Sequence, residues 1–255
     1  MSQPLAPLAD NTIRQLITWV RQGGKIGLSY FNRSQARYKA NQTLVTEADL
    51  KIEQFLVEHF RTAFPEYGLL SEEGYRSPNW DNQAAVWAID PLDGTSVFSQ
   101  GLPGWGISIG LLIQGQPAFG MFYLPLTDDL AISSTTHRQT VRTHWPKNGF
   151  LAVDASAHRQ FDLGRIPGIR ALGSVGANLI YTARGAATAA LLPKARLWDL
   201  VGGATILTAA GGELRYLSGA SIDYLGLLDG ELAPEPIIAG HPAVLDQLQQ
   251  TIRRI

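Results

Sequence analysis

The sequence contains no cysteine among its 255 residues. This absence excludes a disulfide scaffold, a thiolate zinc site, an iron–sulfur cluster and a cysteine nucleophile. Charged residues are also scarce, at 17% of the chain, whereas an average domain has about 25%. A large buried core or a buried subunit interface would explain so little charge.

Neither sign of charge dominates, since 21 Lys and Arg residues face 22 Asp and Glu residues. Such a balance provides no general attraction to nucleic acid or to an anionic membrane. No apolar run reaches the roughly 20 residues that span a bilayer, and residues 1–11 lack a basic start followed by a hydrophobic stretch. We therefore expect a cytoplasmic protein without nucleic-acid or membrane partners.

The first half of the chain shows the patterns of two helices and an antiparallel sheet. Asp10 or Asn11 can cap a first helix, because apolar residues then recur at helical spacing. Thr46 and Asp49 form a capping-box-like pair at the start of a second helix. Apolar runs predict strands at 86–89, 105–113, 118–124 and 130–133, with a hairpin turn at 114–117.

The second half alternates strands with helices. We expect strands at 151–153, 169–172 and 189–192, and helices at 177–183, 199–210 and 243–252. The chain is therefore predicted to combine an α+β N-terminal half, residues 1–146, with an α/β C-terminal half, residues 147–255. Pro146 and Gly149 are the candidate hinge residues between them.

The densest chemical signal is the segment Asp90-Pro91-Leu92-Asp93-Gly94-Thr95, which begins where an apolar strand is expected to end. Two carboxylates three residues apart can converge on a hard cation. Gly94 permits a sharp turn, after which the amides of Gly94 and Thr95 can face an anion. The alternative interpretation is a solvated Asp/Gly turn.

Three further acids lie at expected element ends. Asp49 is in the first turn of the second helix, Glu72 follows the apolar pair Leu69-Leu70, and Asp199 opens the helix at 199–210. Each could simply cap a helix or sit in a wet loop. If they meet Asp90 and Asp93 in one cleft, they form the oxygen-only composition of a Mg²⁺ site. Magnesium beside an anion-facing turn indicates phosphoryl chemistry.

These motifs together resemble one protein family. DPLDGT at 90–95, SEEG at 71–74, LVTEAD at 44–49 and WDLVGG at 198–203 are similar, in order and spacing, to the inositol monophosphatase family of magnesium-dependent, lithium-sensitive phosphatases. The resemblance covers residues 13–252. It implies a layered αβαβα sandwich, two or three Mg²⁺ ions, a small phosphorylated metabolite as substrate, and a homodimer.

The resemblance also assigns roles to residues. A first metal site is matched by Glu72, Asp90 and the Leu92 carbonyl. A second is matched by Asp90, Asp93 and Asp199, so that Asp90 would bridge the two. A third is matched by Glu72 with waters. Gly94 and Thr95 match the phosphate cradle. Thr95, supported by Asp49 or Glu72, matches the group that activates the attacking water. Lys39 falls in a segment that closes on the site in relatives.

The expected substrate pocket departs from the family pattern. Ser174 matches a substrate contact, but Leu192 stands where inositol monophosphatases usually carry a glutamate that holds ring hydroxyls. A leucine accepts no hydrogen bond. Lys194 and Arg196 could meet a second phosphate, or could be solvated loop cations.

The sequence thus predicts a Mg²⁺-dependent phosphomonoesterase of small sugar, polyol or nucleotide phosphates. A first alternative is a catalytically silent relative that binds or regulates, although every expected acid is present. A second is a serine hydrolase, because Gly106-Ile107-Ser108-Ile109-Gly110 is a literal GxSxG. That motif lies in an expected strand rather than in a strand–turn–helix elbow, which argues against this chemistry.

Overall fold

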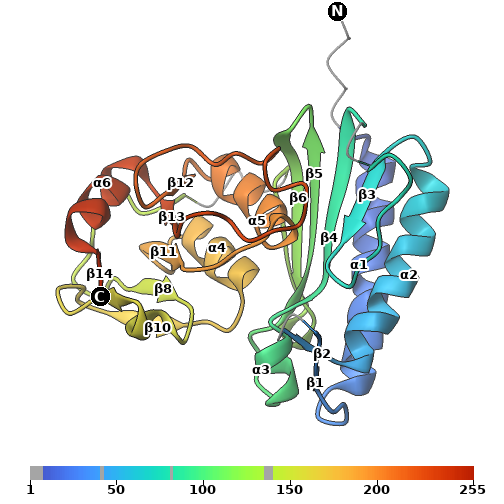
Figure 1. Ribbon diagram of the computed structural model, residues 1–255, viewed down its shortest axis with the longest axis horizontal. Helices are drawn as coiled ribbons and strands as arrows, with labels where there is room; N and C mark the ends of the chain where they lie inside the picture. The colour runs from blue at the N-terminus through green and yellow to red at the C-terminus, as the bar shows by residue number, and fades with distance from the viewer. Residues whose placement is uncertain (1–7, 41–42, 81–82, 135–139) are drawn as a thin grey trace, which may run out of the picture.

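The structure is a computed structural model that describes residues 8–40, 43–80, 83–134 and 140–255. Figure 1 shows five layers in the order helices, sheet, helices, sheet, helix. The predicted αβαβα sandwich is therefore confirmed. Among the described residues, no helix has both the length and the apolar character needed to cross a membrane.

The first outer layer consists of α1 (Asp10–Tyr30) and α2 (Glu47–Ala63), which pack against each other and against the first sheet. Thr46 caps α2 as predicted: its hydroxyl accepts from the Ala48 amide, and its own amide donates to Asp49 Oδ2 at 2.8 Å. The short hairpin of β1 (Arg37–Tyr38) and β2 (Leu44–Val45) runs directly into this helix.

The first sheet has the strand order β3-β4-β5-β6-β7. Only the β3–β4 pair is parallel, and the hairpin between β5 and β6 is the predicted one. The five strands are β3 (Gly68–Ser71), β4 (Ala85–Asp93), β5 (Gly106–Ile113), β6 (Gln116–Leu124) and β7 (Asp129–Ile132).

The middle layer contains α4 (Val175–Ala183) and α5 (Leu197–Ala209), and α5 packs on β4, β5 and β6. Glycines allow this close approach, because a Cβ on Gly202 would lie 2.8 Å from the Ser108 hydroxyl oxygen. The first turn of α5 is thereby fixed against the sheet, next to the end of β4.

The second sheet has the strand order β10-β8-β11-β13-β12, parallel through β11 and antiparallel beyond it. Helix α6 (Pro242–Thr251) packs on β13 and forms the last layer. The strands are β8 (Leu151–Val153), β10 (Ile169–Ala171), β11 (Ala189–Leu192), β12 (Glu213–Tyr216) and β13 (Ile237–Gly240). β9 (Phe161–Asp162) pairs with β14 (Arg253–Arg254) outside this sheet.

Two expectations need correction. Strand β4 does not end at Ile89 but continues through the Asp90–Asp93 segment, where its register with β5 shifts. Strands β12 and β13, which the sequence analysis does not predict, complete the second sheet. The division of the chain into halves at residue 146 stays a prediction.

Candidate active site

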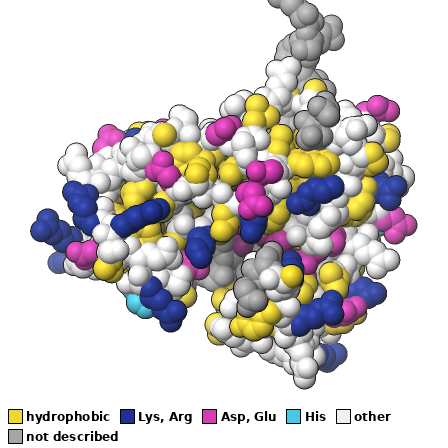
Figure 2. Space-filling view, in the orientation of Figure 1, with side chains coloured by type: hydrophobic (Ala, Val, Ile, Leu, Met, Phe, Trp, Pro, Cys, Tyr) yellow, Lys and Arg dark blue, Asp and Glu magenta, His cyan; other side chains and the backbone are white. Residues whose placement is uncertain are grey.

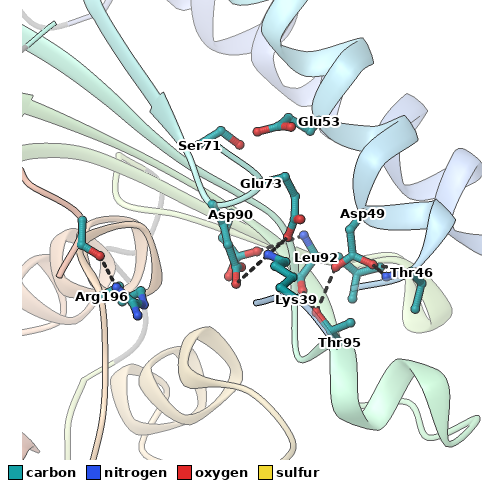
Figure 3. A network of polar contacts seen from close by, with 12 residues as sticks. Lys39, Thr46, Asp49, Glu53, Ser71, Glu73, Asp90, Leu92, Thr95 and Arg196 are labelled. Atoms are coloured by element: carbon teal, nitrogen blue, oxygen red, sulfur yellow. Dashed lines mark hydrogen bonds and ion pairs between the residues drawn. The ribbon is translucent and has the colours of Figure 1, made fainter. Parts of the chain in front are cut away.

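Three carboxylates from separate elements meet where β4 ends. Glu72 follows β3, Asp90 lies in β4 and Asp199 lies in the first turn of α5. One oxygen from each can be chosen so that all three lie within 4.8 Å of one another. Figure 3 shows Asp90 within the polar network that surrounds this cluster. The sequence prediction that these acids converge is confirmed by the geometry, whereas their individual roles stay predictions.

Local hydrogen bonds hold the acids in place. Asp90 Oδ1 accepts from the Leu92 amide at 2.9 Å, which folds the segment after Pro91 back on itself. Asp199 Oδ2 accepts from the Arg196 amide at 2.7 Å, as an acid in the first turn of a helix commonly does. Each of the two carboxylates is thus fixed by a backbone amide close to it in the sequence.

Asp93 lies beside this cluster and is held by the start of α4. Its carboxylate accepts from the Gly176 amide at 2.6 Å and from the Val175 amide at 3.2 Å. Burial raises the pKa of Asp93 from its ordinary 3.8 to about 7, although these hydrogen bonds act in the opposite direction. Asp93 therefore sits in a site that disfavours an isolated negative charge.

The same cause acts on the rest of the cluster. Burial, followed by the charges of Glu72 and Asp93, raises the pKa values of Asp90 and Asp199 well above the ordinary value. Burial also raises the pKa of Glu72, and the Lys39 ammonium opposes that shift. A divalent cation would relieve this repulsion. The donor set is all oxygen, which fits Mg²⁺ or another hard cation.

Thr95 links the turn after β4 to the start of α2. Its hydroxyl lies 2.9 Å from Asp49 Oδ1 and 3.2 Å from the Leu92 carbonyl oxygen. Asp49 is completely buried, and burial raises its pKa. Asp49 is therefore more than a helix cap, because one carboxylate oxygen caps α2 and the other accepts from Thr95 (Figure 3).

Gly94 forms the turn between β4 and the five-residue helix α3 (Thr95–Ser99). Its φ of +94° lies in the left-handed region. A Cβ at this position would also lie 3.0 Å from the Ser174 Cβ. Two requirements thus select glycine here, and the turn lies in the wall of the same pocket as the acids.

The pocket has a volume of about 530 Å³ and is open to solvent. In Figure 2 the surface is hollowed at its lower margin, between the region of β10 and that of α3, which both contribute to this wall. Residues expected to bind metal, phosphate or substrate that line it are Glu72, Asp90, Leu92, Asp93, Gly94, Thr95, Ser174, Leu192, Lys194 and Asp199.

The expected substrate residues differ in their placement. Lys194 is exposed at the pocket, and Leu192 is a buried wall residue at the end of β11. Ser174 caps α4 by accepting from the Ala177 amide at 3.1 Å. Arg196 is not part of the lining, because its guanidinium donates to the Gly230 carbonyl and lies 5.8 Å from the Trp198 ring centroid. A direct substrate contact by Arg196 stays a prediction.

Two residues of this region escape the sequence analysis. Glu73 has a side chain only 2% exposed, and its Oε1 lies 2.7 Å from Lys39 Nζ. Asp154, which follows β8, lines the pocket. The doubled acid in Ser71-Glu72-Glu73-Gly74 is a signal for Glu73, but the family resemblance assigns a role only to Glu72.

The GxSxG motif has no nucleophile geometry. Ser108 lies within β5 and is fully buried, and its hydroxyl oxygen lies 3.3 Å from the Trp198 carbonyl oxygen. Its pairing partner across the sheet is Asp90. The serine supports the packing of α5 on the sheet, and the absence of a strand–turn–helix elbow at this position argues against a serine hydrolase.

Known proteins share this sequence and fold. "Nus factor SuhB" of Xylella fastidiosa is 28% identical over 93% of this chain and 92% of its own. "Inositol-1-monophosphatase" of Bacillus subtilis is 26% identical over 89% and 90%. A staphylococcal inositol monophosphatase-1, described as a 100 mM LiCl soaked inhibitory complex, has a TM-score of 0.81 at 19% identity, covering 96% of both chains. An IMPase/NADP phosphatase complexed with Mg²⁺ and phosphate has a TM-score of 0.80 at 19% identity, covering 94% of both chains.

The fold, the carboxylate pocket and these relatives define the class of protein, which is a phosphoric monoester hydrolase. The chain belongs to the inositol monophosphatase family, whose sequence profile matches residues 9–253.

Proposed function

We propose that the protein is a Mg²⁺-dependent phosphomonoesterase that hydrolyses a small sugar, polyol or nucleotide phosphate. One observation carries the proposal: the Glu72, Asp90 and Asp199 carboxylates lie within 4.8 Å of one another in the pocket that also contains the left-handed turn at Gly94. A cluster of acids suits cations, and a left-handed turn whose amides face the pocket would suit phosphate. Together they suit a phosphate ester bound through metal ions.

The residues that would hold Mg²⁺ are the three clustered acids, Asp93 and the Leu92 carbonyl. We propose two or three ions, with Asp90 shared between two of them. When bound, the ions would lower the pKa of a coordinated water and stabilise the charge of the leaving oxygen. The protein's part is to keep the acids converged, and the packing of α5 on the sheet supports that role.

Thr95 and Asp49 would orient the attacking water. The Thr95 hydroxyl lies 2.9 Å from Asp49 Oδ1, so its hydrogen points to that carboxylate and its lone pairs are free to accept from a water. A proton leaving the water could then pass along the hydroxyl toward Asp49, whose buried carboxylate has a raised pKa. Gly94 and the Thr95 amide would hold phosphate oxygens.

The pocket supports a broad substrate range. Leu192 presents an apolar wall where a hydrogen-bond acceptor would grip a polyol ring, and Lys194 places a cation at the pocket. We propose that Ser174, Leu192 and Lys194 contact the alcohol part of the substrate. Arg196 would act through its positive charge, which opposes the rise in the pKa of Asp199 that burial causes. Selection of inositol 1-phosphate over other esters would be modest.

A phosphate-release screen tests the proposal. Inositol 1-phosphate, fructose 1,6-bisphosphate, 3′-phosphoadenosine 5′-phosphate and histidinol phosphate would be incubated with the protein, with and without Mg²⁺. The proposal predicts Mg²⁺-dependent release from at least one ester. Release from none of the esters would instead favour a catalytically inactive protein with a binding or regulatory role. The name of the Xylella relative, "Nus factor SuhB", is consistent with that alternative. A homodimer and a cytoplasmic location remain part of the proposal, and analytical ultracentrifugation would test the first.

A further inference from the structure

The β1–β2 hairpin contributes to the wall of the catalytic pocket through β2, whereas β1 is exposed. Thr43 and Leu44 line the pocket, whereas both residues of β1 are exposed, Tyr38 at 71%. The ladder joins only two residue pairs, extended by the hydrogen bond from the Lys39 amide to the Thr43 carbonyl at 2.8 Å. A two-stranded hairpin of this length is not stable by itself. Contacts to the rest of the protein must therefore hold it in place.

An ion pair between Lys39 and Glu73 joins the hairpin to the loop that contains Glu72. Lys39 Nζ lies 2.7 Å from Glu73 Oε1 and 3.9 Å from Glu72 Oε1. The Glu73 side chain is 2% exposed, and that of Lys39 is 21% exposed. A charge-assisted hydrogen bond to a buried carboxylate is strong, and removing one partner leaves the other charge buried and unpaired.

The two neighbouring glutamates thus have different partners. Glu72 belongs to the group of converging carboxylates, and Glu73 does not belong to it among the described residues. Figure 3 shows Glu73 directed to Lys39. Lys39 therefore binds Glu73 closely and lies within ion-pair distance of Glu72, which belongs to the cluster.

We propose that Glu73 is a positioning residue: it binds the Lys39 ammonium and so holds the two paired strands of the hairpin, β1 and β2, against the carboxylate cluster. Through Lys39 it fixes the wall that contains Thr43 and Leu44, next to the anion-facing turn at Gly94. The consequence for catalysis rests on the proposed function, whereas the structural link can be measured without any substrate. Glu73 itself touches neither the metal ions nor the ester.

The structural link is tested by amide hydrogen exchange on the full chain. Glu73→Gln keeps the size and an acceptor oxygen but removes the charge that holds Lys39. The proposal predicts amide exchange at residues 37–45 that is at least about tenfold faster, with unchanged protection in α2 and β4. A tenfold change corresponds to a decrease of about 1.4 kcal/mol in the free energy of local opening. Asp246→Asn is the control, because Asp246 pairs with Arg215 at the same 2.7 Å but on an exposed surface far along the chain. Unchanged exchange at 37–45 in Glu73→Gln would overturn the proposal.

If Glu73→Gln fails to fold, Lys39→Met breaks the same pair from its more exposed side and should accelerate exchange at 37–45 equally. Kinetics then separate positioning from direct action. Glu73→Gln and Lys39→Met should each lower kcat/KM at least about tenfold, and the double variant should be no worse than Lys39→Met alone within about twofold. A further loss in the double variant, or a raised Mg²⁺ requirement in Glu73→Gln, would show that Glu73 acts on the metal and overturn the proposal.

The two proposals fail in different ways. If the wild type releases no phosphate from any ester, the proposed function is wrong, and exchange at residues 37–45 still decides whether Glu73 holds the hairpin. If the wild type is active and Glu73→Gln leaves both exchange and kcat/KM unchanged, only the role of Glu73 is wrong.

Discussion

The Thr95 hydroxyl and the Asp49 carboxylate lie 2.9 Å apart although 46 residues separate them in the chain. Asp49 also completes the cap of α2, with its second oxygen 2.8 Å from the Thr46 amide. One buried acid therefore fixes both the start of a helix and the orientation of a hydroxyl at the pocket. This arrangement places an acceptor carboxylate beside the Thr95 hydroxyl, and a hydroxyl that donates to it can still accept from a water.

Removing this hydroxyl should lower turnover. We expect Thr95→Val to reduce kcat at saturating Mg²⁺ by at least about a hundredfold, the usual range for general acid–base groups. Thr95→Ser is the matched control, because it keeps the hydroxyl and should retain kcat within about tenfold. Steady-state kinetics on the best ester of the screen measures both. A Thr95→Val variant that turns over like Thr95→Ser would show that the hydroxyl plays no part in the reaction.

Local signals predict much of the framework. The pair Thr46 and Asp49 predicts the start of α2, because capping needs only residues within one turn. The acids at 72, 90, 93 and 199 stand at or near element ends, and their number predicts a shared cation site. The family motifs add their order along the chain.

Other features depend on contacts between distant segments. Pro91 in the Asp90–Asp93 segment favours a strand end, yet β5 holds the segment extended across a register shift. β13 lies in the sheet between β12 and β11, and β11 comes more than forty residues earlier in the chain. The burial of Glu73 depends on Lys39, 34 residues away, and the engagement of Arg196 with Gly230 depends on a loop 34 residues later. No local pattern contains these pairings.

The metal-free protein should lose stability as the pH rises. Burial raises the pKa values of Asp93 and Glu73 to about 7 from 3.8 and 4.5. The folded state therefore binds more protons than the unfolded state between about pH 4 and pH 7, so its free energy of unfolding falls across that window and levels off above it. Urea unfolding in the presence of a chelator at pH 5 and pH 8 measures the difference in the free energy of unfolding between the two pH values. Each unit of pKa shift between the folded and unfolded states corresponds to about 1.4 kcal/mol.

The same unfolding measurement with Mg²⁺, and with an Asp93 variant, tests the cause of this pH dependence. Saturating Mg²⁺ should restore stability at pH 8 and have little effect at pH 5, because bound cations replace the protons. Asp93→Asn should flatten the metal-free pH dependence. A free energy of unfolding that rises between pH 5 and pH 8 in chelator would contradict the assigned pKa directions.

Leu192 should limit selectivity for polyol rings. We expect the wild type to prefer inositol 1-phosphate over glycerol 2-phosphate by less than about a hundredfold, or 2.7 kcal/mol. Leu192→Glu should increase that preference several-fold by supplying an acceptor for ring hydroxyls. Leu192 is only 1% exposed, so the variant should also have a lower Tm, since a carboxylate is buried there.

The ratio of kcat/KM for the two esters is the decisive quantity, because the fraction of folded enzyme cancels from it. Leu192→Gln, which supplies an acceptor without a charge, is the control for electrostatic effects on phosphate. A wild-type preference already above a hundredfold would show that other residues grip the ring.

Lithium should inhibit the enzyme. The motifs proposed to hold the second cation resemble those of the inositol monophosphatase family, to which the chain belongs. A small monovalent ion in that site could hold the product phosphate without completing the catalytic cycle. We expect LiCl at tens of millimolar to lower the rate at sub-saturating Mg²⁺, with equal concentrations of KCl as the control. Rates that are equal in the two salts would count against a normal site at Asp90, Asp93 and Asp199.

The central claim is that the acids around Asp90 hold the metal ions that hydrolyse the phosphate ester. Its most direct test is the Mg²⁺-dependent rate of phosphate release by Asp90→Asn, compared with the wild type on the same ester and checked for folding by circular dichroism. We predict a loss of several orders of magnitude at saturating Mg²⁺, because the shared ligand of two ions is gone. A folded Asp90→Asn enzyme that keeps more than about a tenth of wild-type turnover, a barrier change below about 1.4 kcal/mol, would contradict the account.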